Sequence, residues 1–205
     1  MFVPISDHHA IQEVVFALTF KRQFPLGLLE QLTSIHKEIK RELPRMERPQ
    51  VFQFAIGGGP VAPPQQAPSP VSFEAYKRDG SLDWRMMADG NTLVVNCLTY
   101  TNWADVSKRS LSLIHNACNV IMQQGTNDIS HIALQYVDVF KWGLKSEDYD
   151  ISLLLDSNSE NIPKSLFRNV DGPLWHHHQG WFRPFAGSME GNLLQRTHLD
   201  AMNEG

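Results

Sequence analysis

Two Asp-Gly pairs, Asp79-Gly80 and Asp89-Gly90, constrain the fold of this chain more than any other feature. Each pair separates segments in which apolar residues alternate with other residues. Glycine in such a pair tolerates the positive φ that a tight hairpin turn requires. The sequence therefore predicts an antiparallel meander of three strands with one wet face. We expect these strands at residues 71–77, 82–88 and 92–100.

Segments with a helical period and further segments with a strand period surround this meander. Apolar residues recur at steps of three and four over residues 25–43 and over residues 103–124, where Asn102 supplies an N-cap, so two amphipathic helices are expected. A period of two over residues 13–20, 51–56 and 129–142 predicts further strands. Each helix has one apolar stripe, which one face of a sheet can cover. We therefore expect an α+β fold, a mainly antiparallel sheet of about six strands with both amphipathic helices on one face.

The pattern weakens after Trp142, and this suggests the domain organisation. We expect residues 1–142 to form the α+β core domain and residues 143–205 to form a smaller, irregular C-terminal extension that ends in a frayed tail. Within the core, residues 57–70 contain five prolines and three glycines without charge, which predicts an exposed loop. A proline-rich docking segment is the alternative for this loop.

Composition excludes several classes of function. The chain of 205 residues has a net charge of −4 and no block of like charges, which argues against a nucleic-acid binder. No apolar run approaches the length of a membrane span, and the first residues carry no positively charged leader. Cys97 and Cys118 lie in apolar runs and are expected to be reduced thiols. We therefore expect a cytoplasmic protein with no membrane association, whose partner is another protein.

Three segments of the chain also resemble a known group of proteins. These are HAIQEVVFALTF, DWRMMADGNTLVVNCLTYTNWADV and ISHIALQYVDVF, within residues 10–142. Together they are similar to a sporadically distributed bacterial family of uncharacterised proteins, which share a strand opening with an acidic residue, a Tyr-x-x-Trp at the second helix and a Leu-Arg-Tyr-x-Asn strand. The matching residues are Glu13, Tyr100, Trp103, Leu134 and Tyr136.

The chain departs from that family at two positions of the last strand. Gln135 stands where arginine is usual, and Asp138 stands where asparagine is usual, so a role tied to that arginine does not carry over. The resemblance brings no established activity with it. The patchy distribution of the family suggests mobile genes, as defence, immunity or antitoxin genes are, which is an argument by association.

The candidate binding residues lie at the second helix and the last strand of the core. Tyr100 and Trp103 flank a strand-to-helix corner, where packing of the helix onto the sheet and contact with a ligand are the two alternatives. Tyr136 and Asp138 share one face of the strand by alternation. A carboxylate on that apolar face needs a partner, so Asp138 is either a hydrogen-bonded core residue or an acid and binding group.

The run His176-His177-His178 is expected to be a surface cluster of histidines, and a metal site is the alternative. In an extended chain His176 and His178 lie on the same face and could supply two imidazoles to zinc, with His198 or Asp171 as a third ligand. We expect no cofactor, and zinc is the alternative to that expectation.

No catalytic motif accompanies these residues. The sequence has no G-x-S-x-G, no phosphate loop, no G-x-G-x-x-G and no C-x-x-C. We therefore expect a non-catalytic binding or accessory protein, with a bacterial defence or antitoxin component as one form of it. The alternative is a hydrolase that uses histidine and carboxylate groups, with or without zinc.

Overall fold

The computed structural model describes residues 1–48, 70–123, 128–185 and 191–202. These residues form two compact units, which are described separately here. The first unit comprises residues 5–139, and the second comprises residues 1–4 together with residues 140–205. The predicted strand at residues 51–56 and all but the last residue of the predicted loop at residues 57–70 lie outside the described residues.

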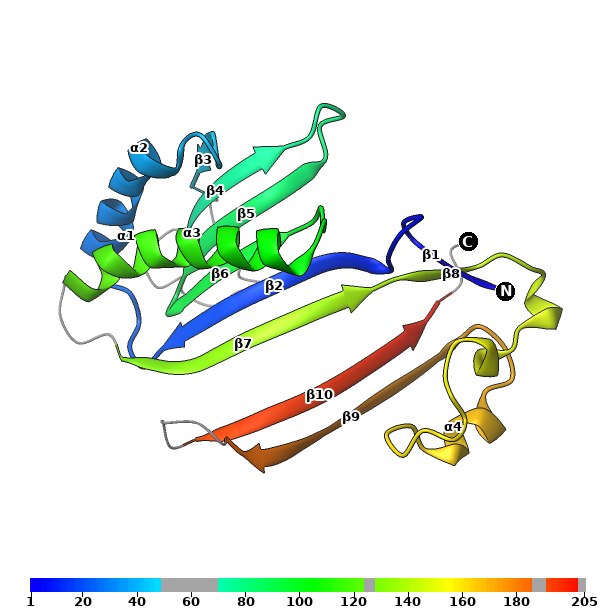
Figure 1. Cartoon of the computed structure of the whole chain (residues 1–205). Helices are drawn as coiled ribbons and strands as arrows, with labels where there is room; N and C mark the ends of the chain where they lie inside the picture. Colours follow the sequence, from blue (N-terminus) through cyan, green and yellow to red (C-terminus); the bar gives the residue numbers. More distant parts are fainter. Residues whose placement is uncertain (49–69, 124–127, 186–190, 203–205) are drawn as a thin grey trace, which may run out of the picture. The chain divides into compact units, whose positions relative to one another are not determined.

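A six-stranded antiparallel sheet forms the first unit, in the order β3-β4-β5-β6-β2-β7 (Figure 1). The α+β prediction is therefore confirmed. The meander is also confirmed, because β4, β5 and β6 are consecutive neighbours and Gly80 and Gly90 have φ of 85° and 59° at the two turns. The strands are β2 (Ile11–Phe20), β3 (Arg45–Glu47), β4 (Val71–Tyr76), β5 (Leu82–Asp89), β6 (Thr92–Cys97) and β7 (Ile129–Asp138).

The predicted helices cover one face of this sheet (Figure 1). The first consists of α1 (Leu26–Leu32), a 3-10 turn at Thr33–Ile35 and α2 (His36–Ile39). The second is α3 (Trp103–Gln123), and the backbone N–H of Asp105 donates to Oδ1 of Asn102 at 3.0 Å, as an N-cap requires. None of the described helices is long and apolar enough to cross a membrane.

The core lies between these helices and the helix-facing residues of β2, β4, β5 and β6. Val14, Phe16, Leu18 and Phe20 of β2 are buried, while the residues between them are partly exposed. Cys97 is fully buried in this core, and burial raises the pKa of its thiol to about 11. Neither Cys97 nor Cys118 forms a disulfide in the structure. A thiol with such a pKa stays protonated near neutral pH, which makes Cys97 a packing residue.

The expected strand over residues 129–142 is divided. It contains β7 of the first unit and β8 (Phe140–Trp142) of the second unit, where β8 pairs with β1 (Phe2–Pro4). Val139 separates them, and its backbone N–H and C=O bond to Ala10 and Ile5. The prediction of one continuous strand was wrong, because a period of two continues across a change of sheet without a signal.

The second unit contains more regular structure than expected. A long hairpin joins β9 (Trp175–Pro184) to β10 (Asn192–Ala201), and α4 (Lys164–Asn169) precedes it. The expectation of a frayed tail was therefore wrong for residues 192–201. Much of β10 is exposed, so its side-chain pattern carries little signal, and ten backbone register pairs with β9 define the strand. Two 3-10 turns, Ser146–Asp148 and Ile151–Leu153, lie between β8 and α4.

Aromatic side chains connect the parts of the second unit. The ring of Phe2 lies 4.9 Å from Trp142 and 5.6 Å from Tyr149, between ring centroids. The indole N–H of Trp175 donates to the hydroxyl of Tyr149 at 2.8 Å. This cluster holds β1, β8 and the start of β9 in one packed group.

Candidate functional site

The two edges of the six-stranded sheet differ in their protection against pairing. At one edge, β3 has three residues, of which Arg45 and Glu47 are charged. At the other edge, β7 has ten residues and contains no lysine, arginine or proline. In the part of the chain that the structure describes, no strand pairs with the outer side of β7. Long apolar edges without charges or prolines are suited to pairing with another strand.

Apolar side chains of β7 extend the core face beyond its helical cover. Ile132, Leu134 and Tyr136 stand opposite the buried Leu18, Phe16 and Val14 of β2, so they lie on the same face of the sheet. They are nevertheless 69%, 47% and 43% exposed. The reason is that α3 packs against β6 and α1 and leaves this side of β7 uncovered (Figure 1).

Trp103 joins this apolar row at the start of α3. Its ring stacks on Phe16, with centroids 5.9 Å apart and planes 11° apart, and lies 6.2 Å from the ring of Tyr136. Trp103 remains 45% exposed. One face of the indole therefore packs on the sheet, while much of the ring stays accessible. We call Trp103, Ile132, Leu134 and Tyr136 the β7 strip.

Tyr100 is partly buried and packs against the core. Its carbonyl oxygen lies 3.1 Å from Nε2 of His9, and the two rings meet edge to face with centroids 5.2 Å apart. This contact packs Tyr100 against the segment that precedes β2. The pKa of Tyr136 is raised, first by partial desolvation and then by Tyr100 and Asp138 nearby. The four predicted binding residues thus lie at one end of β7.

Asp138 differs from the prediction in its surroundings. Its side chain is exposed, whereas alternation placed it on a buried apolar face. The reason is that the helix-facing side of β7 is uncovered, and the pairing of β2 with β7 shifts register between Ile11 and Glu13, at this end of the strand. The interpretation of Asp138 as a buried hydrogen-bonded carboxylate was therefore wrong.

Asp138→Asn is expected to change the free energy of unfolding by no more than about 0.5 kcal/mol, because substitutions at exposed positions have small effects. Asp138→Leu should be tolerated almost as well, since it leaves no buried donor unpaired. Urea titrations of the two variants and the unchanged chain measure these differences. A loss above about 2 kcal/mol in Asp138→Leu would show that the carboxylate has a buried partner after all.

A row of polar side chains crosses the opposite face of the sheet and was not predicted. The amide nitrogen of Asn96 donates to Oε1 of Glu13 at 2.6 Å, and Nε of Arg85 donates to Oδ1 of Asn96 at 3.3 Å. Asn96 is 5% exposed. These residues satisfy one another, which favours a structural role for the row.

A hollow of about 230 Å³ near the start of α3 contains Arg109 and Trp84 in its wall. Arg109 is already engaged, because its guanidinium lies 4.3 Å above the Trp84 ring and donates to the Glu42 carboxylate and backbone oxygen at 3.2 and 2.9 Å. The Arg109 guanidinium therefore links α3 to Glu42, which follows α2. The hollow therefore offers no free cation to a ligand.

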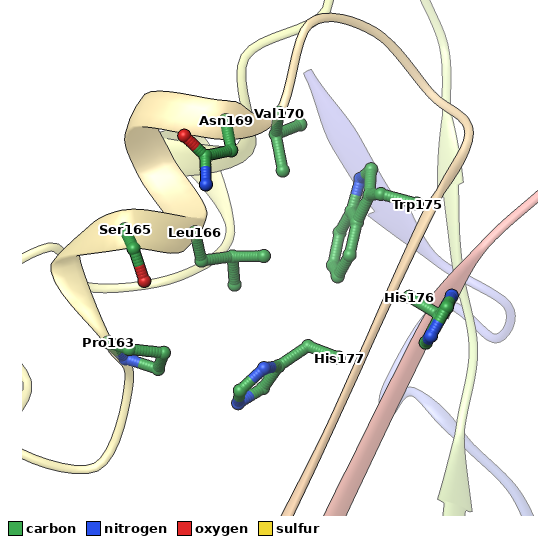
Figure 2. A pocket seen from close by; sticks show the side chains of 8 residues that line it. All are labelled: Pro163, Ser165, Leu166, Asn169, Val170, Trp175, His176 and His177. Atoms are coloured by element: carbon green, nitrogen blue, oxygen red, sulfur yellow. The ribbon is translucent and has the colours of Figure 1, made fainter.

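A second hollow, of about 320 Å³, lies between α4 and β9 in the second unit (Figure 2). His177 and Trp175 point to the α4 side, beside Leu166, whereas His176 extends to the other side of the strand. Nε2 of His177 is buried and has no hydrogen-bond partner among the described residues. The expected alternation is confirmed, since His176 and His178 are exposed and His177 between them is partly buried.

The structure also places the residues considered as a third metal ligand. His198 is the register partner of His178 across the hairpin, whereas Asp171 lies in the loop before β9. Among the described residues, no three His, Cys, Asp or Glu side chains are already arranged around one point. His176, His178 and His198 thus share one face of the hairpin, but their side chains do not point toward a common position.

Sequence reasoning missed the exposure of Ile132 and Leu134. No local signal revealed it, because residues 129–138 lack the lysines and prolines that commonly mark edge strands and therefore resemble a central strand. Comparison of the chain with protein-family models, with curated proteins and with solved structures gave no match at the threshold applied.

Proposed function

We propose that this protein is a non-catalytic binding protein that accepts an extended segment of a protein partner along the outer side of β7. The partner segment adds a strand to the sheet by backbone hydrogen bonds and packs apolar side chains on the β7 strip. The observation that carries the proposal is the contrast between the sheet edges. The edge at β3 is short and charged. The edge at β7 is long and apolar on one face, and residues 129–137 contain no lysine, arginine, aspartate or glutamate.

The chemistry of the edge defines the segment that fits it. Side chains alternate along an added strand, so the segment needs apolar residues at every second position to meet Leu134 and Tyr136. Aromatic residues are frequent energetic anchors in interfaces, and Trp103 with Tyr136 supplies a pair of them. The exposed carboxylate of Asp138 favours a lysine or arginine at the corresponding end of the segment.

Charge favours a different protein over a second copy of this chain as the occupant. If two β7 strands paired, neither would bring a lysine or arginine to Asp138, because β7 contains none. The two ends of the edge also differ, with aromatic residues at Tyr136 and aliphatic ones at Ile132. A bound strand would therefore run in one defined direction.

The resemblance to the sporadically distributed bacterial family adds a biological setting to this proposal. Accessory proteins of defence or antitoxin systems act by holding a partner protein, and this is the role that we propose. A zinc-dependent hydrolase, the alternative, would depend on the hairpin histidines and has no support from the β7 strip.

Selection of peptides from a random display library against the full-length protein tests the proposal. We expect the enriched peptides to carry apolar residues with a period of two and a basic residue near one end. Leu134→Lys should weaken their binding at least about tenfold, because it places a charge in the centre of the strip. The matched control is Leu153→Lys, which changes a leucine of similar exposure, 59%, in the second unit.

Two outcomes would contradict this assignment. One is the enrichment of peptides whose binding is equally strong with Leu134→Lys and with the unchanged chain, when both melt at the same temperature. The other is a dimer in light scattering that Leu134→Lys converts to monomer, which would assign the edge to a second copy.

A further inference from the structure

The β9–β10 hairpin brings four metal-binding side chains onto one face, independently of the β7 strip. Alternation along β9 places His176 and His178 on the same side. The register pairs His178 with His198 and His176 with Asp200. Three imidazoles and one carboxylate therefore form a block of two adjacent cross-strand pairs.

The spacing within this block suits a transition metal ion. Residues directly opposite each other in antiparallel strands have Cβ atoms about 4.5–5.5 Å apart. The ring centroids of His178 and His198 are 5.0 Å apart. Two imidazoles bound to one tetrahedral zinc, with Zn–N bonds of about 2.0–2.1 Å, have ring centres about 5 Å apart. The observed separation of the rings matches that of two ligands, but the rings are stacked with planes 24° apart and must turn for their nitrogens to face one ion.

Asp200 orients one of these rings. Its Oδ2 lies 3.2 Å from Nε2 of His198. A carboxylate that accepts a hydrogen bond from one imidazole nitrogen leaves the other nitrogen free to bind metal and makes the ring a better ligand. In His198 the free nitrogen is Nδ1. This is the arrangement that supports metal-bound histidines in general.

The remaining requirement is rotation of exposed side chains. His176 and His178 are exposed, and His198 and Asp200 have side chains that are 57% and 45% exposed. Rings at such positions change rotamer rapidly, so convergence on one ion needs no change in the backbone. A hairpin of two strands is also marginally stable by itself, and a metal bridge between the strands would stabilise it.

We propose that His176, His178 and His198 bind a divalent transition metal ion with the preferences of zinc, and that Asp200 holds His198 in its binding orientation. Three protein ligands leave the fourth position to a water molecule. Arg196 precedes His198 by two positions on the same face, opposite Gly180. Its charge opposes a bound cation, so the affinity is expected to be lower than that of closed structural zinc sites.

Titration of the full-length, untagged and chelator-treated protein with Zn²⁺ by calorimetry tests the site, and Co²⁺ serves as a spectroscopic probe. We expect one ion per chain and the visible absorption of four-coordinate Co²⁺. The double variant His178→Ala/His198→Ala should bind at least about tenfold more weakly, because it removes two of three ligands. The control His177→Gln changes the neighbouring residue on the opposite face and should keep the affinity.

NMR of the histidine ring protons in the unchanged chain provides a measurement that does not depend on the folding of a variant. Added Zn²⁺ should shift the resonances of His176, His178 and His198. The proposal is overturned by shifts confined to other histidines, by the absence of binding, or by equal affinity in the double variant. A loss of binding in His177→Gln that matches the double variant would also overturn it.

Discussion

Leu113→Ala is expected to lower the free energy of unfolding of the first unit by about 2–5 kcal/mol. Leu113 is completely buried at the centre of α3, and shortening it leaves a cavity between the helix and the sheet. Alanine is a better helix former than leucine, so a loss cannot come from helix propensity. Urea titration followed by the helical circular dichroism signal measures the change.

The control for this substitution lies two residues away on the same helix. Leu111 is 58% exposed, so Leu111→Ala should change the free energy of unfolding by about 0.5 kcal/mol at most. The comparison tests the orientation of α3 on the sheet. Equal losses for the two variants would mean that the helix is rotated relative to the structure described here.

Asn96→Asp is expected to destabilise the first unit by about 1–3 kcal/mol at pH 7. The change replaces the amide that donates to Glu13 with a carboxylate that cannot donate, at a site that is 5% exposed. Two carboxylates that share a site raise the pKa of one of them in the folded state. When that carboxyl group is protonated, the two groups no longer repel each other. The folded state of the variant is therefore more stable at low pH and loses this stability as pH rises through the raised pKa.

The difference between Asn96→Asp and the unchanged chain should therefore shrink when the titration is repeated near pH 4. Asn96→Leu provides the comparison, because it removes the amide without adding a titratable group. Its loss should not depend on the protonation of a new carboxyl group. An Asn96→Asp variant that is destabilised equally at both pH values would show that Glu13 and Asn96 do not share a buried site.

The elements of the first unit could be predicted because local signals mark them. The Asp-Gly pairs define the turns of the meander, and the polar cap Asn102 defines the start of α3. The position of β7 at an edge could not be predicted in this way. A period of two is the same in a central and an edge strand, and the difference depends on which elements α3 covers.

The same limit applies to the candidate sites. Alternation placed Asp138 and Tyr136 on one face, but exposure depends on the helix above them, and that face proved to be open. Alternation also placed His176 and His178 together correctly. The pairing of His178 with His198 required the register of the hairpin, which the side chains of β10 do not encode strongly because that strand is largely exposed.

The pairing of β1 with β8 has a consequence for the order of folding during synthesis. Phe2 is made well before its partners Trp142 and Tyr149, which follow about 140 residues later in the chain. The unit of residues 5–139 has all its sheet partners within one continuous stretch and can fold while the chain is still being made. Residues 1–4 must then wait, unpaired, until β8 is made. Closing so long a loop is slow compared with forming local contacts, so the second unit is expected to complete its structure last.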